Sequence, residues 1–223
     1  MIKSSLILFF LSVLLFVSCK KDKQEVNFHH EYFPLEEGTF VEYQVTQTSY
    51  VNGVGTTKSY KLKTVVGDTI IDNSGRVARK FYRYLFDEFE QKYVVKDLWT
   101  AIIDQERAEL VEENQRMIKL VFAPTLAKEW DGNAFNDSAQ AFLYYDKIHK
   151  PFKTGNFDFD STLIVEEDST LNFIEYRRKY EVYAAGIGLI KKHYQDFTVD
   201  SGNYLAPKNG NEFFYEILSF GVE

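Results

Sequence analysis

Polar and apolar residues alternate along much of the chain, which is the pattern of half-buried β-strands. The alternation is clear at residues 40–46, and the Asn52-Gly53 pair that follows is a strong signal for a tight hairpin turn. Residues 59–66 then suit the returning strand. An aromatic-rich alternating stretch at residues 77–86 extends the pattern. The first half of the chain therefore predicts an antiparallel meander.

The rest of the chain carries the same signal, with breaks rich in Gly, Asn, Asp and Ser between strand-like runs. These runs lie at residues 93–99, 100–104, 141–148, 160–166, 171–182, 188–197 and 213–220. The chain therefore predicts a mainly β fold, a single antiparallel domain of about nine to twelve strands. A curved sheet, a barrel or a sandwich would protect the edges of so many hairpins.

One stretch is ambiguous between strand and helix. Residues 105–113 hold several glutamates and an alanine that suit a helix, whereas Met117 to Phe122 resembles a strand that ends before Pro124. Both readings stay open, so the prediction allows one helix near residues 106–120.

The N-terminus has the layout of a secretory signal. Lys3 supplies a positive start, residues 6–17 are almost all apolar, and small residues follow. A bilayer-spanning helix needs about 20 apolar residues, so this run is too short to serve as a lasting anchor. We expect residues 1–18 to be a signal peptide that is removed. Ordinary secretion and an uncleaved anchor are the alternatives.

Cys19 is the only cysteine of the 223 residues, and it lies at the expected cleavage site. Phe16-Val17-Ser18-Cys19 resembles the lipobox of bacterial lipoproteins, with Phe16 where Leu is usual. The resemblance implies acylation of Cys19, and two or three acyl chains hold a protein stably on a membrane. Residues 19–30 are then a lipidated, flexible tether, in which Phe28 is the first residue expected to dock. The β-rich domain is residues 31–223.

Composition narrows the possible partners. The formal net charge is −7, which repels nucleic acid phosphates, so we expect no DNA or RNA binding. Acylation of Cys19 would leave no thiol for a disulfide. The charged stretch at residues 20–25 partly resembles a surface-export signal of Bacteroidetes lipoproteins, so a periplasmic and a surface-facing location on the outer membrane both stay open.

Three short stretches resemble uncharacterised secreted lipoproteins of the Bacteroidetes type. They are Tyr32-Phe33-Pro34-Leu35 with Gly38 and Tyr43, then Trp130-Asp131-Gly132-Asn133, then Tyr183-Ala184-Ala185-Gly186-Ile187-Gly188-Leu189-Ile190-Lys191. Position 40 is Phe where Trp is frequent. The resemblance implies an envelope location and a strand-rich domain, and it implies no activity.

Catalytic and metal-binding motifs are weak. His29 and His30 lie in the tether and are expected to be solvated, and no zinc pattern is present, so we expect no metal and no cofactor. Gly186 and Gly188 lack the third glycine of a nucleotide-binding loop and predict a bulge or a tight bend before a strand. No serine sits in a nucleophile elbow. We assign no catalytic residue.

Paired carboxylates are the basis of an alternative hypothesis, an extracellular hydrolase. Asp158 and Asp160 would share one face of a strand, Asp168 adds a carboxylate, and Asp146 with His149 could act as acid and base. Exposed strand-end carboxylates are the simpler interpretation of the same residues.

The aromatic residues give the leading hypothesis. Trp99, Trp130, Tyr144 and Tyr145 are the candidates for binding a sugar ring or for lining an apolar pocket, although aromatics on strands mostly fill cores. The sequence therefore predicts a non-enzymatic, membrane-anchored envelope lipoprotein that binds a glycan, a lipid or an envelope protein. A structural or assembly role is a further alternative.

Overall fold

Twelve antiparallel strands form one continuous sheet in the computed structural model, which describes residues 26–223. The predicted mainly β, single antiparallel fold is confirmed. The strands are β1 (Thr39–Val51), β2 (Val54–Ile71), β3 (Val77–Asp87), β4 (Lys92–Ile103), β5 (Arg107–Glu112), β6 (Gln115–Val121), β7 (Glu129–Asp131), β8 (Phe142–Thr154), β9 (Phe157–Leu171), β10 (Glu175–Ala184), β11 (Gly188–Val199) and β12 (Pro207–Val222), preceded by the 3-10 turn η2 (His30–Tyr32). The predicted signal peptide and Cys19 lie outside the described residues.

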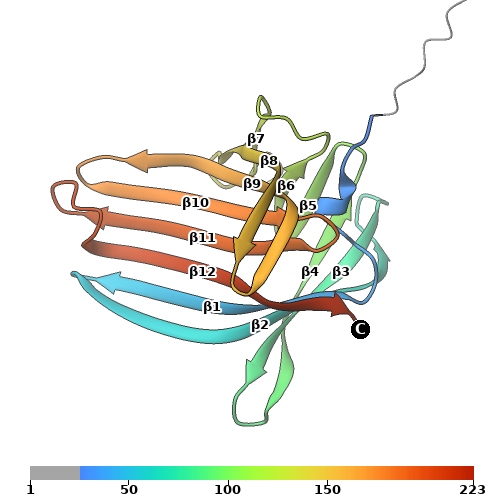
Figure 1. The fold of residues 1–223 in the computed structure, drawn as a ribbon, viewed down its shortest axis with the longest axis horizontal. Helices are drawn as coiled ribbons and strands as arrows, with labels where there is room; N and C mark the ends of the chain where they lie inside the picture. The colour runs from blue at the N-terminus through green and yellow to red at the C-terminus, as the bar shows by residue number, and fades with distance from the viewer. Residues whose placement is uncertain (1–25) are drawn as a thin grey trace, which may run out of the picture.

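The sheet consists of two meanders joined at their middle. The strand order is β6-β5-β4-β3-β2-β1-β12-β11-β10-β9-β8-β7, so every neighbour is a hairpin partner except the β1/β12 pair. That pair runs from Thr39 opposite Val222 to Tyr50 opposite Gly210. The first and last strands of the chain therefore hold the two halves together (Figure 1).

The stretch near residues 106–120 is a hairpin, so the helix allowed there is wrong. β5 and β6 pair through a two-residue turn in which Glu113 and Asn114 both have positive φ, 47° and 64°. Ala108, Leu110, Ile118 and Leu120 are buried in the core. Burial of one strand face outweighs the modest helix propensity of the glutamates.

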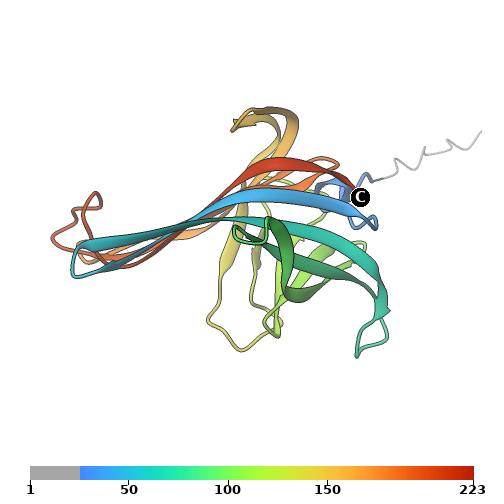
Figure 2. The same cartoon turned by 90° about the horizontal axis from the view of Figure 1, so that it is seen from below.

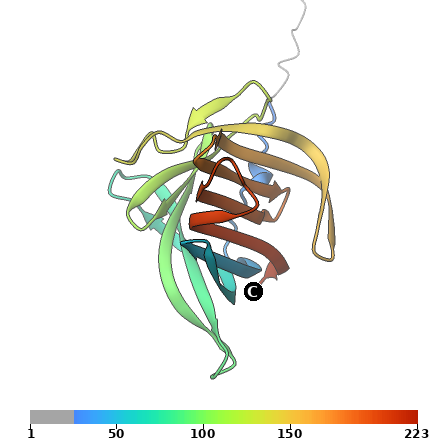
Figure 3. The same cartoon turned by 90° about the vertical axis from the view of Figure 1, so that its left-hand side faces the viewer.

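The sheet curls into a barrel over only part of its length. Strands β3–β6 fold beneath the sheet, as Figures 2 and 3 show, while the far ends of the β1/β2, β9/β10 and β11/β12 hairpins continue outward as a flat extension. The barrel interior holds one core, which includes Leu110, Leu120, Leu163 and Tyr183.

The tip of the β8/β9 hairpin bends across the opposite face of the sheet from β3–β6 (Figures 1 and 2). Phe152 and Phe157 near this tip pack on a second cluster that contains Ile164, Val182 and Ile217. The hydroxyl of Thr154 donates a 2.9 Å hydrogen bond to Glu216 of β12. The hairpin therefore covers an apolar patch that would otherwise face solvent.

The barrel closes at a seam between the edge strands β6 and β7. One backbone hydrogen bond joins Ile118 N–H to the carbonyl of Gly132 (2.9 Å). Side chains bind the other edge groups of β6: Trp130 Nε1 donates to the Ile118 carbonyl (3.1 Å), and the Tyr145 hydroxyl bridges the N–H and carbonyl of Val121. Buried backbone groups need such partners, so these aromatics complete the barrel.

Candidate functional site

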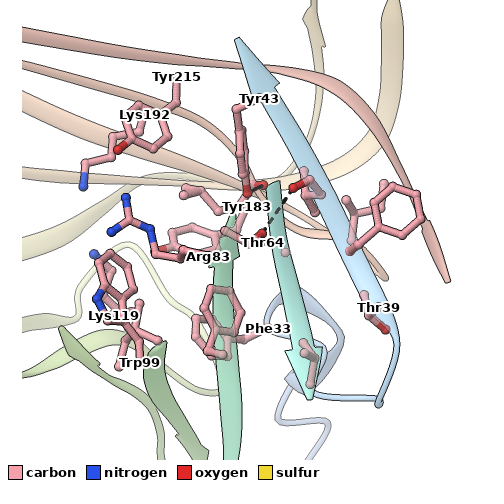
Figure 4. Close-up of a pocket in the computed structure, with 18 of the residues that line it drawn as sticks. Phe33, Thr39, Tyr43, Thr64, Arg83, Trp99, Lys119, Tyr183, Lys192 and Tyr215 are labelled. Atoms are coloured by element: carbon pink, nitrogen blue, oxygen red, sulfur yellow. Dashed lines mark hydrogen bonds between the residues drawn. The ribbon is translucent and has the colours of Figure 1, made fainter. Parts of the chain in front are cut away.

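A cavity of about 80 Å³ lies inside the barrel, between the curled strands and the main sheet (Figure 4). Such a space holds a few water molecules or part of a small ligand. It is lined by Phe33, Pro34, Thr39, Phe40, Val41, Tyr43, Leu62, Thr64, Val66, Phe81, Arg83, Trp99, Leu110, Glu112, Lys119, Glu181, Tyr183, Ile187, Gly188, Leu189, Lys192 and Tyr215. Most of these side chains are aliphatic or aromatic.

Strand alternation explains why the walls are apolar. Val41, Tyr43 and Val45 occupy every second position of β1 and are all buried. The Tyr43 hydroxyl donates a 2.8 Å hydrogen bond to the Leu189 carbonyl, which satisfies its one polar group. Burial raises the pKa of Tyr43 well above its usual value, so the phenol stays neutral. This side of the cavity therefore presents no charge.

Charged side chains gather at the other end. Figure 4 shows Arg83, Lys119 and Lys192 on the side of the cavity away from Phe33 and Thr39. Three cations and two carboxylates, Glu112 and Glu181, line the space. A third carboxylate, Asp97, pairs with Arg83 from outside the lining, so the charges balance but more cations than carboxylates face the cavity.

Glu181 is the centre of the charged end. It is 5% exposed, and its carboxylate accepts hydrogen bonds from Lys119 (2.8 Å), Tyr194 (2.7 Å) and Tyr183. Burial alone would raise the pKa of Glu181, but the Lys119 and Lys192 ammonium groups lower it to about 2. The group is ionised at neutral pH and its charge is matched by Lys119.

Lys192 has a longer ion pair than Lys119 or Arg83 has. Its Nζ lies 3.8 Å from the Glu181 carboxylate and makes no hydrogen bond within residues 26–223, although its side chain is only 18% exposed. The ammonium also lies over the Tyr194 ring, 4.2 Å from its centroid. Burial lowers the pKa of Lys192, and the Glu181 carboxylate opposes this shift.

Arg83 contributes unused donors at the same end. It is 6% exposed, and its guanidinium lies 3.8 Å above the ring of Trp99. Nη1 alone makes the two hydrogen bonds to Asp97, at 3.2 and 3.1 Å. A guanidinium has five N–H donors, so Arg83 can bind a further acceptor.

A wider groove of about 540 Å³ adjoins the uncharged end of the cavity. The two spaces share Phe33, Pro34, Thr39, Phe40 and Ile187 in their walls, so these side chains form the boundary between them. The groove is otherwise lined by the segment before β1, the turn before β11 and the end of β12. The two adjoining spaces, called the path below, are narrow and charged inside and wide and mostly apolar outside.

The N-terminal segment, residues 28–38, closes this end of the barrel. Phe28 packs on the barrel core, as expected of the first docking residue, and its carbonyl accepts from Ala123 N–H (2.9 Å). The carbonyl of Glu31 accepts from Gly186 N–H at 2.7 Å. Pro34 meets Gly188, where an added Cβ would lie 3.4 Å from the proline ring. The segment is therefore fitted to the turn before β11.

The stretches that carried the sequence resemblance meet in this region. Tyr32, Phe33 and Tyr183 belong to the barrel core together with Trp130. Residues 185–187 form the predicted tight bend, and β11 begins at Gly188. These residues close the barrel at its end and at its seam, so their pattern reflects architecture more than chemistry.

The histidines of this segment are less solvated than expected. His29 and His30 are half-buried, and the His29 ring lies 4.3 Å from that of His149. The Tyr32 hydroxyl bonds His149 Nδ1 (2.7 Å) and Ser161 (2.6 Å). Among the described residues, no group of three or more His, Cys, Asp or Glu side chains is placed to hold a metal ion.

The candidate carboxylates do not assemble into a site. Asp158 and Asp160 share a strand face as predicted, but both are exposed, and Asp158 pairs only with the exposed Lys153 (3.3 Å). Asp146 and Asp168 are exposed as well. They project singly into solvent, so the arrangement does not support the hydrolase hypothesis.

The four candidate aromatics divide into three environments. Trp99 lines the cavity, where it stacks on Arg83. Tyr144 lies outside the cavity, with its hydroxyl 3.3 Å from Glu166. Trp130 and Tyr145 are 8% and 2% exposed and close the seam. Of the four, Trp99 alone is placed to touch a ligand in the cavity.

The sequence reasoning missed the charged residues of the cavity. Arg83, Lys119, Glu181 and Lys192 all lie within strand-like runs, where charges usually face solvent. Lys119 did give a signal, because it stands in the middle of the apolar run Met117–Phe122. A charge at an inward position of a strand can mark an interior site.

No family model matches this chain, and no curated protein does either. Two solved structures resemble it in outline. One is a protein of Bacteroides fragilis that is thought to be exported and is described as having a YmcC-like fold. Its sequence is 13% identical, the match covers 84% of this chain and 98% of that one, and the TM-score is 0.46. The other is a protein of Parabacteroides distasonis that is thought to be a lipoprotein. Its sequence is also 13% identical, the match covers 85% of this chain and 98% of that one, and the TM-score is 0.37. Within residues 26–223, no helix is long and apolar enough to cross a membrane.

Proposed function

We propose that this protein is a non-enzymatic lipoprotein of the cell envelope that binds a single-chain lipid in its barrel. The observation that carries the proposal is the path along the barrel, in which the interior cavity and the wide groove share a wall of apolar side chains. A long, thin, apolar ligand fits such a path better than a flat sugar ring does. Of the three ligand classes suggested by the sequence, lipid is therefore the one we favour.

The position of the groove supports this choice. His30, Glu31, Leu35 and Glu36 of the N-terminal segment line the groove. Six residues lie between Cys19 and Val26, a span of seven Cα–Cα steps, so an acylated Cys19 would keep the start of the described chain within about 25 Å of a membrane surface. A groove on this side of the barrel could exchange a lipid with that membrane over a short distance.

Binding is tested by titration of the mature chain, residues 19–223, carrying Cys19→Ala, which removes the acylation site. A fluorescent fatty acid should bind at one site per chain and should be displaced by an unlabelled fatty acid. If no saturable binding is seen, the proposed function is wrong.

A substitution at the boundary of the two spaces locates that binding. Thr39 lines both cavity and groove, so Thr39→Trp should block the path and weaken binding about ten-fold or more. Thr56→Trp is the matched control, because Thr56 is exposed on β2 outside the barrel. Circular dichroism checks that both variants fold. Equal binding by Thr39→Trp and Thr56→Trp would place the lipid elsewhere.

The membrane anchor is tested separately in cells. A clickable fatty acid should label the parent protein and should not label the Cys19→Ala variant. Equal label on both proteins would contradict acylation at Cys19 without affecting the binding experiment.

A further inference from the structure

We propose that the lipid bound in the barrel has an anionic head group, which Arg83 and Lys192 hold at the inner end of the cavity. This inference rests on the proposed function, because it names the chemistry of the ligand at the same site. A single-chain fatty acid in its carboxylate form is the simplest molecule of this class.

The first argument is the charge of the walls. Three cations and two carboxylates line the space, so more positive than negative groups face a ligand there, although Asp97 outside the lining pairs with Arg83. Of the three cations, Lys192 has the longest ion pair, 3.8 Å to Glu181, so an anionic group placed beside it would stabilise its charge. A neutral head group would add no such interaction, and a cationic head group would repel Lys192.

The second argument is the supply of donors. Glu181 is already satisfied by Lys119 and two tyrosine hydroxyls, whereas Lys192 Nζ lies 3.8 Å from it. Arg83 uses only Nη1 for Asp97. Two cationic side chains therefore face the cavity with donors to spare, and an oxyanion accepts charge-assisted hydrogen bonds from both kinds of group.

The third argument is the direction of the path. The cations lie at the end away from Phe33 and Thr39, and the apolar groove begins beyond those residues (Figure 4). A head group beside Arg83 would therefore send its chain past Phe33, Phe40 and Ile187 into the groove. The two ends of an amphiphilic anion match the two ends of the space.

The test varies the ligand and leaves the protein unchanged. Lauric acid, dodecanol, methyl laurate and dodecylamine share one chain length and differ at the head. At neutral pH the carboxylate should displace the fluorescent probe at about ten-fold or more lower concentration than the alcohol or the ester, because a charged acceptor forms stronger hydrogen bonds with Arg83 and Lys192 than a neutral one does. The amine should be the weakest competitor.

Two neighbouring lysines provide matched variants. Lys192→Met removes the inner cation and should reduce the preference for acid over alcohol to a few-fold, whereas Lys191→Met, on the adjacent position and outside the cavity lining, should keep it. If all four compounds compete equally in the parent chain, the anionic head is wrong although lipid binding stands. If none competes, the proposed function itself fails. Because the ligand series needs no substitution, a misfolded variant cannot hide either result.

Discussion

At the scale of single residues, the pairing of Glu181 makes the stability of the protein depend on acid pH. The pKa of Glu181 is lowered from 4.5 to about 2 in the folded chain. A group with a lowered folded pKa stabilises the protein above its unfolded pKa, and that contribution is lost as the pH falls through the folded value. The free energy of unfolding should therefore decrease between pH 4.5 and about 2.

Glu181→Gln isolates this contribution. Gln is close in size, cannot ionise and leaves Lys119 with only its 3.9 Å contact to Glu112 as an ion pair, so the variant should be less stable at neutral pH and should lose less stability over the acid range. Urea unfolding at a series of pH values measures both effects. Parallel pH curves for the two proteins would show that Glu181 is not the group that titrates.

The seam gives a second prediction at this scale. Tyr145→Phe keeps the ring but leaves the N–H and carbonyl of Val121 without the hydroxyl that binds both. The loss should be about 1–3 kcal/mol of unfolding free energy. Tyr144→Phe is the matched control, since that hydroxyl makes one long bond to Glu166, and it should cost less than about 1 kcal/mol. Similar losses for the two variants would mean that the seam does not depend on Tyr145.

Single residues also show what strand alternation can and cannot predict. The alternation at residues 40–46 correctly predicted a half-buried strand, and in β1 the side chains of Val41, Tyr43 and Val45 are buried. Alternation could not show that Trp99 lines the cavity whereas Trp130 closes the seam, because each environment depends on which distant strand lies opposite.

At the scale of elements, the Asn-Gly turn signal was reliable and helix propensity was not. Asn52-Gly53 forms the predicted turn between β1 and β2, with both residues at positive φ. Residues 106–120 have helix-compatible composition, yet they form β5 and β6 because both strands bury a face in the barrel. Contacts with residues distant in sequence therefore determine the secondary structure of this stretch.

The pairing of β11 with β12 depends on a glycine. Gly210 has φ of 131°, and a Cβ there would lie 2.0 Å from the Asp196 carbonyl oxygen. Gly210→Ala should therefore destabilise the fold by about 2 kcal/mol or more, because the backbone must move.

Gly53→Ala is its control. Gly53 also has positive φ, 81°, but open space around it, so alanine there adds only the conformational cost of about 1–2 kcal/mol. Thermal unfolding compares the two. A loss at Gly210 no larger than that at Gly53 would show that the close approach of β11 is not required.

At the scale of the whole molecule, the continuity of the sheet depends on strands from the two ends of the described chain. The β1/β12 pair is the one neighbour relation in the sheet that no hairpin supplies. The side chain of Ser219 on β12 donates a 2.6 Å hydrogen bond to Glu42 on β1, 177 residues away in sequence. Alternation and turns predict hairpins, but such a distant pairing has no local signal, so the barrel, the cavity and its charged end could not be derived from the sequence.

Large apolar side chains are also exposed at the far end of the sheet extension, and they offer a competing place for a lipid. Phe173, Ile174 and Leu205 lie on the loops at its tip and are 77%, 65% and 96% exposed. A lipid that only adheres to these loops would give binding without using the barrel. Where the lipid is bound, rather than whether it binds, therefore distinguishes the barrel site from the loops.

Photo-crosslinking with a fatty acid that carries a diazirine near the end of its chain measures that location directly. After irradiation of the mature Cys19→Ala chain, peptide mapping should find the label on Phe33, Phe40 or Ile187, where the cavity meets the groove. An excess of unlabelled fatty acid should remove it. Label confined to Phe173, Ile174 or Leu205 would contradict a lipid-binding barrel.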